Sequence, residues 1–338
     1  MSSILDYKSP AYTGKAMKIG AGVQASEAQA TANAEGCVVV EGDGPTVGIA
    51  GGYTQGGGTS PLASKFGLAA DQVLEWEVVT GTGELLTATP SQHSDLYWAL
   101  SGGGGGTYGV VLSMTVKLHR NMPTAGATLS LVEPSEKYWV WALNQSNIPY
   151  DFNAINLPEF QDAFATLNPE MNITELNIGG SIIPRSLVAS NTSATSLVNA
   201  IKSILSNGGI LAGVSMDASR VPTSPNAAHP SWRSSLFLAF LGTLYDRANT
   251  TANILGRKSV TQVLDPALDN LTPSPAAYLN EADFNHPDWQ RVFYGENYAK
   301  LRAVKNKYDP EGVLGGQTAV GSESWAVGED GRLCRTGF

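Results

Sequence analysis

Two clusters of glycine constrain this chain more than any other feature of its sequence. The first runs from Gly48 to Gly58 as Gly-Ile-Ala-Gly-Gly-Tyr-Thr-Gln-Gly-Gly-Gly, and the second runs from Gly102 to Gly109. Glycine loses more backbone entropy on folding than any other residue, so clusters persist mainly where the chain turns sharply or approaches a ligand closely. Two clusters in one chain therefore indicate a large ligand held by main-chain groups, for which phosphate oxygens are well suited.

Composition excludes several classes of protein. The 338 residues suffice for one large domain or two smaller ones, and a hydrophobic content of 42% is ordinary for a globular protein. The formal net charge is −9 and no run of Lys or Arg occurs, so no nucleic-acid partner is expected, because binding phosphates requires clustered cations. No apolar run approaches the length of a membrane-spanning helix, and the four histidines lack ligand spacing, so neither a membrane nor a metal partner is expected.

The chain carries mixed indications of its cellular compartment. Sequence alone leaves open whether its two cysteines, Cys37 and Cys334, form a disulfide. Five Asn-x-Ser/Thr sequons favour a secretory-pathway ancestry, and they lie at Asn144, Asn172, Asn191, Asn249 and Asn270. The first six residues, Met-Ser-Ser-Ile-Leu-Asp, lack the basic start and apolar core of a signal peptide, so we expect that this start is not the ancestral one.

Hydrophobic patterning predicts a mixture of strands and helices. In the first part of the chain we expect strands at 16–22, 37–40 and 109–118, the last buried on one face, a hairpin of 71–80 with 84–88, and helices at 24–34 and 94–101. Beyond about residue 120 we expect strands at 127–132, 176–183, 213–216 and 236–244 and helices at 134–143, 158–167 and 193–206. A single long helix is expected from Pro287 to Lys307, where large side chains recur at spacings of three and four.

The second glycine cluster contains the pattern of a dinucleotide-binding loop, at Gly104, Gly106 and Gly109. That fingerprint requires a strand before the loop and a helix after it. Here a predicted helix precedes the loop and a predicted strand follows, so a nicotinamide-binding Rossmann site is not expected. A loop that only turns the chain is the alternative for this cluster taken alone.

The combination of segments is more specific than either cluster. Pro-Thr-Val-Gly-Ile-Ala-Gly-Gly-Tyr-Thr-Gln-Gly-Gly-Gly at 45–58, Gly-Leu-Ala-Ala-Asp-Gln-Val at 67–73 and Asp-Leu-Tyr-Trp-Ala-Leu at 95–100, followed by the second cluster, closely resemble the FAD-linked oxidases of the vanillyl-alcohol-oxidase type. Towards the C-terminus, Tyr-Leu-Asn-Glu at 278–281 and Tyr-Gly-Glu-Asn-Tyr at 294–298 resemble berberine-bridge-enzyme-like members, especially fungal ones. The resemblance runs from about residue 16 to the end.

The resemblance implies an α+β fold in three parts. Residues 1–119 would form the second half of a PCMH-type FAD-binding domain, whose N-terminal subdomain has no counterpart before residue 16. Residues 120–275 would form an α+β substrate-binding subdomain with an antiparallel sheet. Residues 276–338 would form a berberine-bridge-type C-terminal segment that returns to the FAD domain.

The resemblance also assigns binding residues for FAD. Backbone amides of the first cluster would hold the pyrophosphate and flank the flavin ring, residues 109–111 would meet the adenine end, and Tyr278 and Asn280 would lie by the flavin ring. The cofactor-binding residues expected in this way are Thr46, Val47, Gly48, Gly51, Gly52, Gly56, Gly57, Gly109, Val110, Val111 and Asn280. An anionic pyrophosphate suits converging N–H groups where no side chain intervenes.

Two positions depart from the family pattern and argue against a covalent flavin. Many berberine-bridge-like members link flavin through a cysteine where this chain has Gly44, which cannot form a thioether. Relatives often have a histidine where this chain has Thr59. FAD, if it binds, is therefore expected to bind non-covalently.

Glu281 is the best acid/base candidate and Tyr278 a candidate for hydrogen bonding to substrate, while Tyr53 and Glu323 are weaker candidates. A carboxyl in an apolar pocket can have a raised pKa and act near neutrality, although a surface carboxylate is an equal alternative for Glu281. The leading hypothesis is an FAD-linked oxidase that acts on a small secondary metabolite with O₂. A flavin-independent isomerase or cyclase that uses Glu281, and an inactive truncated protein, are the alternatives. The oligomeric state stays open, a homo-oligomer included.

Overall fold

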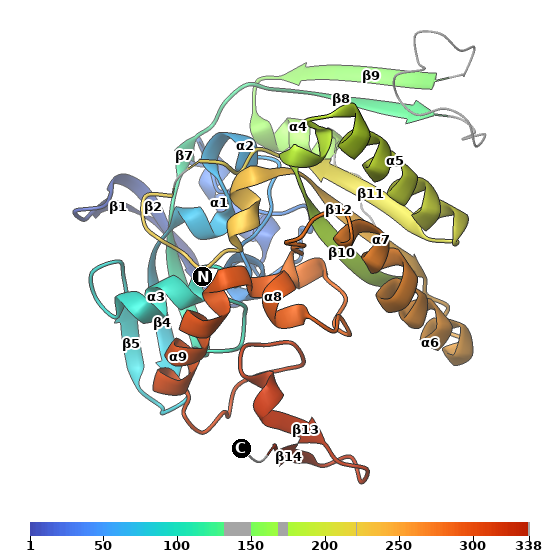
Figure 1. Cartoon of the computed structure of the whole chain (residues 1–338). Coiled ribbons are helices and arrows are strands. Elements are labelled where there is room, and N and C mark those ends of the chain that lie inside the picture. The colour runs from blue at the N-terminus through green and yellow to red at the C-terminus, as the bar shows by residue number, and fades with distance from the viewer. Residues whose placement is uncertain (132–149, 168–174, 221, 337–338) are drawn as a thin grey trace.

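The computed structural model describes residues 1–131, 150–167, 175–220 and 222–336, and these form the expected α+β fold (Figure 1). The larger sheet has the strand order β1-β2-β6-β4-β5, and all its neighbouring strands are antiparallel. Its strands are β1 (Ser2–Lys8), β2 (Thr13–Gly20), β4 (Val73–Thr80), β5 (Leu85–Ala88) and β6 (Gly109–Lys117). A short separate pair joins β3 (Cys37–Val38) to β7 (His119–Arg120). The hairpin of β4 and β5 confirms the hairpin predicted from the sequence. The hydrophobic pattern did not predict β1.

Strand β6 lies between β2 and β4 and differs along its length. Val110 and Leu112 are exposed, but every residue from Ser113 to Lys117 is buried. The prediction of a strand buried on one face is therefore wrong for its second half. That half is covered on both faces: Met114 and Val116 lie in the core, and the Lys117 ammonium donates to the Thr223 hydroxyl.

Short helices pack around the larger sheet. Helix α1 presents Ala28 and Ala32 to the core, and α3 presents Leu96 and Leu100. The small alanine side chains allow close approach, and Trp76 of β4 is fully buried in the same core. The helices of this part are α1 (Ala25–Asn33), α2 (Ala63–Phe66) and α3 (Ser94–Leu100).

A second sheet has the order β10-β12-β11. Its strands are β10 (Leu176–Pro184), β11 (Ile210–Ser215) and β12 (Ser235–Leu244), and beside it lie α5 (Asn191–Ser206), α6 (Thr250–Ser259) and α7 (Asp265–Asp269). Alternate residues of these strands face opposite sides of the sheet. On one side, Ile183 and Ala239 pack with Leu264 in a core near α5 and α7. On the other side, Ile182 and Leu238 pack in a core that also includes residues from the part of the chain with the larger sheet. The second face therefore joins this sheet to the rest of the chain.

A two-stranded hairpin and a helix precede the second sheet. They are β8 (Thr124–Leu131), β9 (Tyr150–Leu157) and α4 (Phe160–Leu167). The helix expected at 134–143 lies outside the described residues, as do the sequons Asn144 and Asn172. The other three sequon asparagines are exposed, and their glycosylation stays a prediction.

The C-terminal segment returns to the first part, where α9 lies beside α3 (Figure 1). The single helix expected at 287–307 is wrong: α8 (Trp289–Tyr294) and α9 (Tyr298–Tyr308) are separate. Gly295 between them has a φ of +58°, and a Cβ there would lie 2.8 Å from Nε2 of His229. The left-handed conformation and this close approach break the helix. Phe293 and Leu301 nevertheless face one core, as their spacing predicts.

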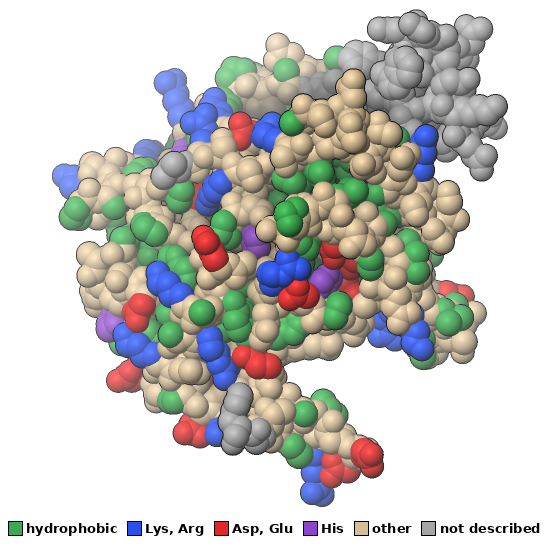
Figure 2. All heavy atoms as spheres, in the orientation of Figure 1, with side chains coloured by type: hydrophobic (Ala, Val, Ile, Leu, Met, Phe, Trp, Pro, Cys, Tyr) green, Lys and Arg blue, Asp and Glu red, His purple; other side chains and the backbone are tan. Residues whose placement is uncertain are grey.

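The chain ends in a projecting hairpin of β13 (Trp325–Val327) and β14 (Leu333–Arg335) (Figure 1). Cys334 of this hairpin is exposed, Cys37 is buried, and both are free thiols, so they do not pair. Among the described residues no helix is long and apolar enough to cross a membrane. Lys and Arg side chains mix with Asp and Glu across the face drawn in Figure 2.

A bidentate ion pair joins the part of the chain that contains the second sheet to the part that contains the larger sheet. The two terminal nitrogens of the Arg233 guanidinium, Nη1 and Nη2, donate to the two oxygens of Asp71, at 2.8 and 2.7 Å. The same carboxylate accepts from the side chain of Asn226 at 2.6 Å and from the backbone N–H of Leu68 at 2.9 Å. The Asp71 side chain is only 3% exposed, so these bonds replace nearly all of its hydration.

We expect Asp71→Asn to lower the free energy of unfolding by about 3 kcal/mol, because it leaves the Arg233 charge without its partner. Urea-induced unfolding followed by tryptophan fluorescence measures this, since Trp76 and Trp232 are fully buried. The matched variant Asp6→Asn changes an exposed carboxylate and should stay within about 0.5 kcal/mol. A loss below about 1 kcal/mol in Asp71→Asn would contradict a stabilising role for the pair.

Candidate cofactor and substrate site

The first glycine cluster forms a kinked helical turn whose ends differ in burial. Ile49 and Ala50 are buried and anchor the turn in the core, whereas Gly52 is exposed. A Cβ built on Gly51 or Gly52 would meet no atom within 4 Å. Val47, just before the turn, is 42% exposed. The turn therefore presents an open surface of backbone, which fits a group that must approach the main chain closely.

The second cluster supports the first. The backbone N–H groups of Gly102 and Gly104 both donate to the carbonyl of Gln55, at 3.0 and 2.9 Å. A Cβ on Gly105 would lie 2.8 Å from Cα of Gly52. Protein atoms thus fill the space that these glycines leave. The second cluster thus packs beneath the first, and the expectation that it also holds a ligand stays a prediction.

The expected adenine-end residues differ in their accessibility. Gly109 is buried, and a Cβ on it would clash with the side chain of Val78. Val111 is 8% exposed and belongs to the core, whereas Val110 is 55% exposed. Of these three residues, only Val110 presents a side chain to an outside group. No contact in the structure tests the expected role of this segment.

Residues 278–281 lie against the first cluster, although more than 200 positions separate them in sequence. The side-chain N–H₂ of Asn280 donates to the carbonyl of Gly52 at 3.0 Å and to the hydroxyl of Tyr278 at 2.8 Å. A Cβ on Gly56 would clash with the Asn280 side chain, and one on Gly57 would lie 3.8 Å from the Tyr278 ring. Gly56 therefore leaves room for this segment, and Asn280 fixes it to the open turn.

Tyr278 and Glu281 have shifted pKa values in this setting. Tyr278 is 3% exposed and packs edge-on against Trp232, with ring centroids 5.5 Å apart. Burial raises the pKa of its hydroxyl, which therefore stays protonated at neutral pH. Burial and the nearby charge of Asp43 raise the pKa of the half-buried Glu281 to about 7. Glu281 is thus a group that can give or accept a proton near neutrality.

Sequence reasoning missed two acids of this neighbourhood, Glu41 and Asp43. Glu41 is 4% exposed, and burial together with Asp43 raises its pKa to about 8. The available signal was a carboxylate directly after the apolar run Val38–Val40, in the loop that leads to the first cluster. Tyr53, a weaker candidate in the sequence, has its pKa raised by burial and by the surrounding acids. Within the described residues no group of three or more His, Cys, Asp or Glu could hold a metal ion.

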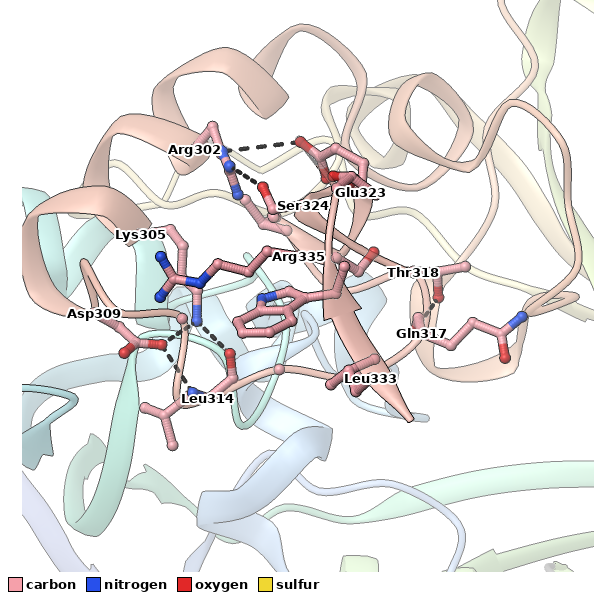
Figure 3. Close-up of a pocket in the computed structure, with 18 of the residues that line it drawn as sticks. Arg302, Lys305, Asp309, Leu314, Gln317, Thr318, Glu323, Ser324, Leu333 and Arg335 are labelled. Atoms are coloured by element: carbon pink, nitrogen blue, oxygen red, sulfur yellow. Dashed lines mark hydrogen bonds and ion pairs between the residues drawn. The ribbon is translucent and has the colours of Figure 1, made fainter. Parts of the chain in front are cut away.

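A hollow of about 870 Å³ lies elsewhere, between α9, the loop after it and the C-terminal hairpin (Figure 3). None of the expected flavin-binding residues lines it, and neither Tyr278 nor Glu281 does. In Figure 3 Arg302 points toward Ser324 and Glu323, with which it forms a hydrogen bond and an ion pair. Glu323 also accepts a hydrogen bond from Tyr298. The structure therefore places Glu323 apart from the candidate site.

Comparison with known proteins gives two family matches. The family described as FAD binding domain matches residues 1–89, and the family described as berberine and berberine like matches residues 277–320. The two matched segments are those that Asn280 joins in space.

Individual relatives match almost the whole chain. The FAD-linked oxidoreductase sor8 of Hypocrea jecorina is 41% identical, over 98% of this chain and 67% of that protein. The VAO-type flavoprotein oxidase VAO615 of Thermothelomyces thermophilus is 39% identical, over 98% and 68%. The crystal structure of the VAO-type flavoprotein MtVAO615 from Myceliophthora thermophila is similar with a TM-score of 0.93 and 36% identity, over 99% of this chain and 72% of that one. The chain, which spans about two thirds of the length of these relatives, belongs to the VAO-type, berberine-like family of FAD-linked oxidoreductases.

Proposed function

We propose that the chain binds FAD without a covalent link and oxidises a small secondary metabolite, with O₂ as the final electron acceptor. The observation that carries this proposal is the pair of hydrogen bonds from Asn280, which holds Tyr278 and Glu281 beside the open glycine turn. The names of the relatives support the class of reaction, since they are FAD-linked oxidoreductases and a flavoprotein oxidase. They favour this function over an isomerase or an inactive protein.

The open turn supports the binding of FAD by backbone groups. Gly51 and Gly52 leave space where any side chain would stand between the main chain and a pyrophosphate. Thr46 and Val47 are exposed beside them and extend the same surface. Gly44 has no thiol to offer a flavin ring, which supports a non-covalent link. Roles for Gly48, Val110 and Asn280 in this binding belong to the same proposal.

The residues of the chain would supply the proton chemistry. When bound, FAD supplies an acceptor for a hydride from the substrate, and O₂ can restore its oxidised form. Ionised Glu281 takes the proton that a substrate hydroxyl or amine loses as its carbon is oxidised. Tyr278, whose hydroxyl keeps its proton, donates a hydrogen bond to the substrate and orients it. Asn280 acts on both by fixing their backbone to the turn.

Cofactor uptake gives a direct test of this proposal. Incubation of the purified chain with FAD, followed by gel filtration, should give protein that absorbs in the visible flavin bands. Acid precipitation should then release the flavin into solution, because no covalent bond holds it. Protein that stays colourless would contradict the proposal, and flavin that stays with the precipitate would contradict the non-covalent link.

Gly52→Ala provides a variant of this experiment that tests the turn itself. Its Cβ points into open space, so the free energy of unfolding should change by less than about 1 kcal/mol. FAD affinity should fall about tenfold or more, because the methyl group occupies the backbone surface. Gly316→Ala is the matched control, since its Cβ also meets no atom within 4 Å and it lies in the loop that lines the separate hollow. Equal affinity in Gly52→Ala and Gly316→Ala would place FAD elsewhere.

The role of Glu281 as the base is tested by its own variant. For any substrate that the FAD-loaded chain oxidises, Glu281→Gln should lower kcat by about 100-fold or more and leave KM nearly unchanged, because the amide cannot take a proton. In the parent enzyme kcat should rise with pH through about 7, where Glu281 ionises, and this limb should vanish in the variant. Oxygen consumption over a pH series measures both.

Glu84→Gln serves as the control, because Glu84 is exposed in the turn between β4 and β5. It should leave the rate and the pH profile unchanged. Full activity in Glu281→Gln, with an unaltered pH limb, would assign the base to another group.

A further inference from the structure

The hollow beside the C-terminal hairpin is a cavity for which the proposed reaction has no use. Its volume of about 870 Å³ lies within the range of roughly 300–1,000 Å³ that is usual for small-molecule pockets. Figure 3 shows it between the hairpin, which carries Leu333 and Arg335, and the loop after α9, which carries Asp309 and Leu314. A molecule held here would be a second ligand of the chain, separate from one at the glycine turn.

The two faces of the hairpin differ in the size of their side chains. Four large side chains line the hollow, and they are those of Trp325, Val327, Leu333 and Arg335. Ala326 and Cys334 are paired across the hairpin and do not line the hollow. Because successive residues of a strand face opposite ways, these two small side chains lie on the outer face. The hairpin thus turns its large side chains toward the cavity.

Apolar side chains in the hollow are unusually open to solvent. On the hairpin Val327 is 71% exposed and Leu333 is 63% exposed, and Val313 of the facing loop is 72% exposed. Removing such surface from water is favourable, and exposed apolar surface that gathers in one place marks a binding site. The half-buried indole of Trp325 adds a flat surface to the same lining. These residues favour a ligand that is apolar and flat.

The charged side chains of the hollow already have partners. Among the described residues that line it, the cations and acids form three ion pairs, which are Arg302 with Glu323, Lys305 with Asp309, and Arg335 with Glu311. His286 also lines the hollow, and its Nε2 lies 2.8 Å from the carboxylate of Asp269. A charged ligand would have to break one of these pairs or bring an unbalanced charge among them, and either is costly. A neutral ligand requires neither.

The wall that faces the hairpin is held in place before any ligand binds. The carboxylate of Asp309 accepts from the backbone N–H groups of Val313 and Leu314, at 3.0 and 2.9 Å. The ammonium of Lys305 donates to the same carboxylate and to the carbonyl of Leu314. A ligand therefore meets a wall that is already ordered, which lowers the entropic cost of binding.

We propose that this hollow binds a neutral aromatic small molecule, between the inner face of the hairpin and the loop after α9. The ring would contact Trp325 and Leu333 on one side and Val313 on the other. The inference does not rest on the oxidase proposal, because no expected flavin-binding residue lines the hollow. A second copy of the chain is the other occupant that exposed apolar side chains could take. The ion pairs within the hollow leave no charge there for such a copy to complement.

Three naphthalene probes test the class of ligand, because they share one ring system and differ in charge. They are 2-naphthol, 2-naphthoate and 2-naphthylmethylammonium, which are neutral, anionic and cationic at neutral pH. Isothermal titration of the full chain should give a Kd for naphthol below about 1 mM, and binding of both ions should be about tenfold weaker or less. Absence of naphthol binding, or tighter binding of either ion, would overturn the proposal.

The indole N–H resonances of the tryptophans show where naphthol binds. In the ¹⁵N-labelled chain the resonance of Trp325, identified by its loss in Trp325→Phe, should shift as naphthol is added. The resonance of Trp232, which packs on Tyr278 in the candidate site, should stay in place, and so should that of the fully buried Trp76. A shift of Trp232 without a shift of Trp325 would put naphthol in the candidate site and contradict the inference.

Leu333→Ser and Cys334→Ser form a matched pair at neighbouring positions of β14. Leu333 faces the hollow, so its replacement should weaken naphthol binding about fivefold or more, because apolar contact is lost. Cys334 faces away, so its replacement should change the Kd by less than about twofold. Both side chains are exposed, so both variants should fold, which circular dichroism checks. Equal affinity in the two variants would remove the hollow as the binding site.

Two further measurements separate this inference from the other occupant and from the proposed function. In sedimentation, a parent chain that is dimeric and becomes monomeric in Leu333→Ser would assign the hollow to a second copy and overturn the proposal. Loading with FAD should leave the Kd for naphthol unchanged. A chain that takes up no FAD but binds naphthol here contradicts the oxidase proposal alone, and a chain that takes up FAD but no naphthol contradicts only this inference.

Discussion

The ion pair between Asp71 and Arg233 is the interaction on which the arrangement of this chain depends. It holds the segment before Arg233 against the first part, where the N–H of Ala227 donates to the carbonyl of Ser101 at 2.8 Å. The backbone of Ala228 then lies so close to Gly102 that no side chain could stand between them. Gly102 in turn bonds to Gln55 of the first glycine cluster. One ion pair, in which the Asp71 carboxylate is buried, thus begins a series of contacts that ends at the open turn.

The candidate site combines two kinds of surface that have opposite requirements. A pyrophosphate needs exposed backbone, which Gly51 and Gly52 provide. A base that works near neutrality needs a carboxyl shielded from water, which Glu281 provides. Asn280 connects these two surfaces, because it donates a hydrogen bond to the exposed turn while its neighbour Tyr278 is buried against Trp232. Gly56 leaves the room for this contact.

Much of the fold follows from local patterns, and the failures have identifiable physical causes. The hairpin of β4 and β5 and the helix α1 were predictable, because alternation and helical composition act over a few residues. The break between α8 and α9 was not predictable, because a single glycine is tolerated within a helix. The contact that requires glycine at position 295 comes from His229, which is distant in sequence. The domain boundaries at 119 and 275 stay predictions, as do the roles of the expected flavin-binding residues.

The sequence by itself determined that a glycine-rich turn and a distant Tyr-Leu-Asn-Glu segment belong to an FAD-linked oxidoreductase, because glycine clusters and ordered motifs are visible residue by residue. Only the tertiary structure decided that the second glycine cluster supports the first and that Asn280 holds Tyr278 against the open turn. The physical reason is that close packing and charge coupling depend on distance in space and on burial, and the order of residues along the chain records neither.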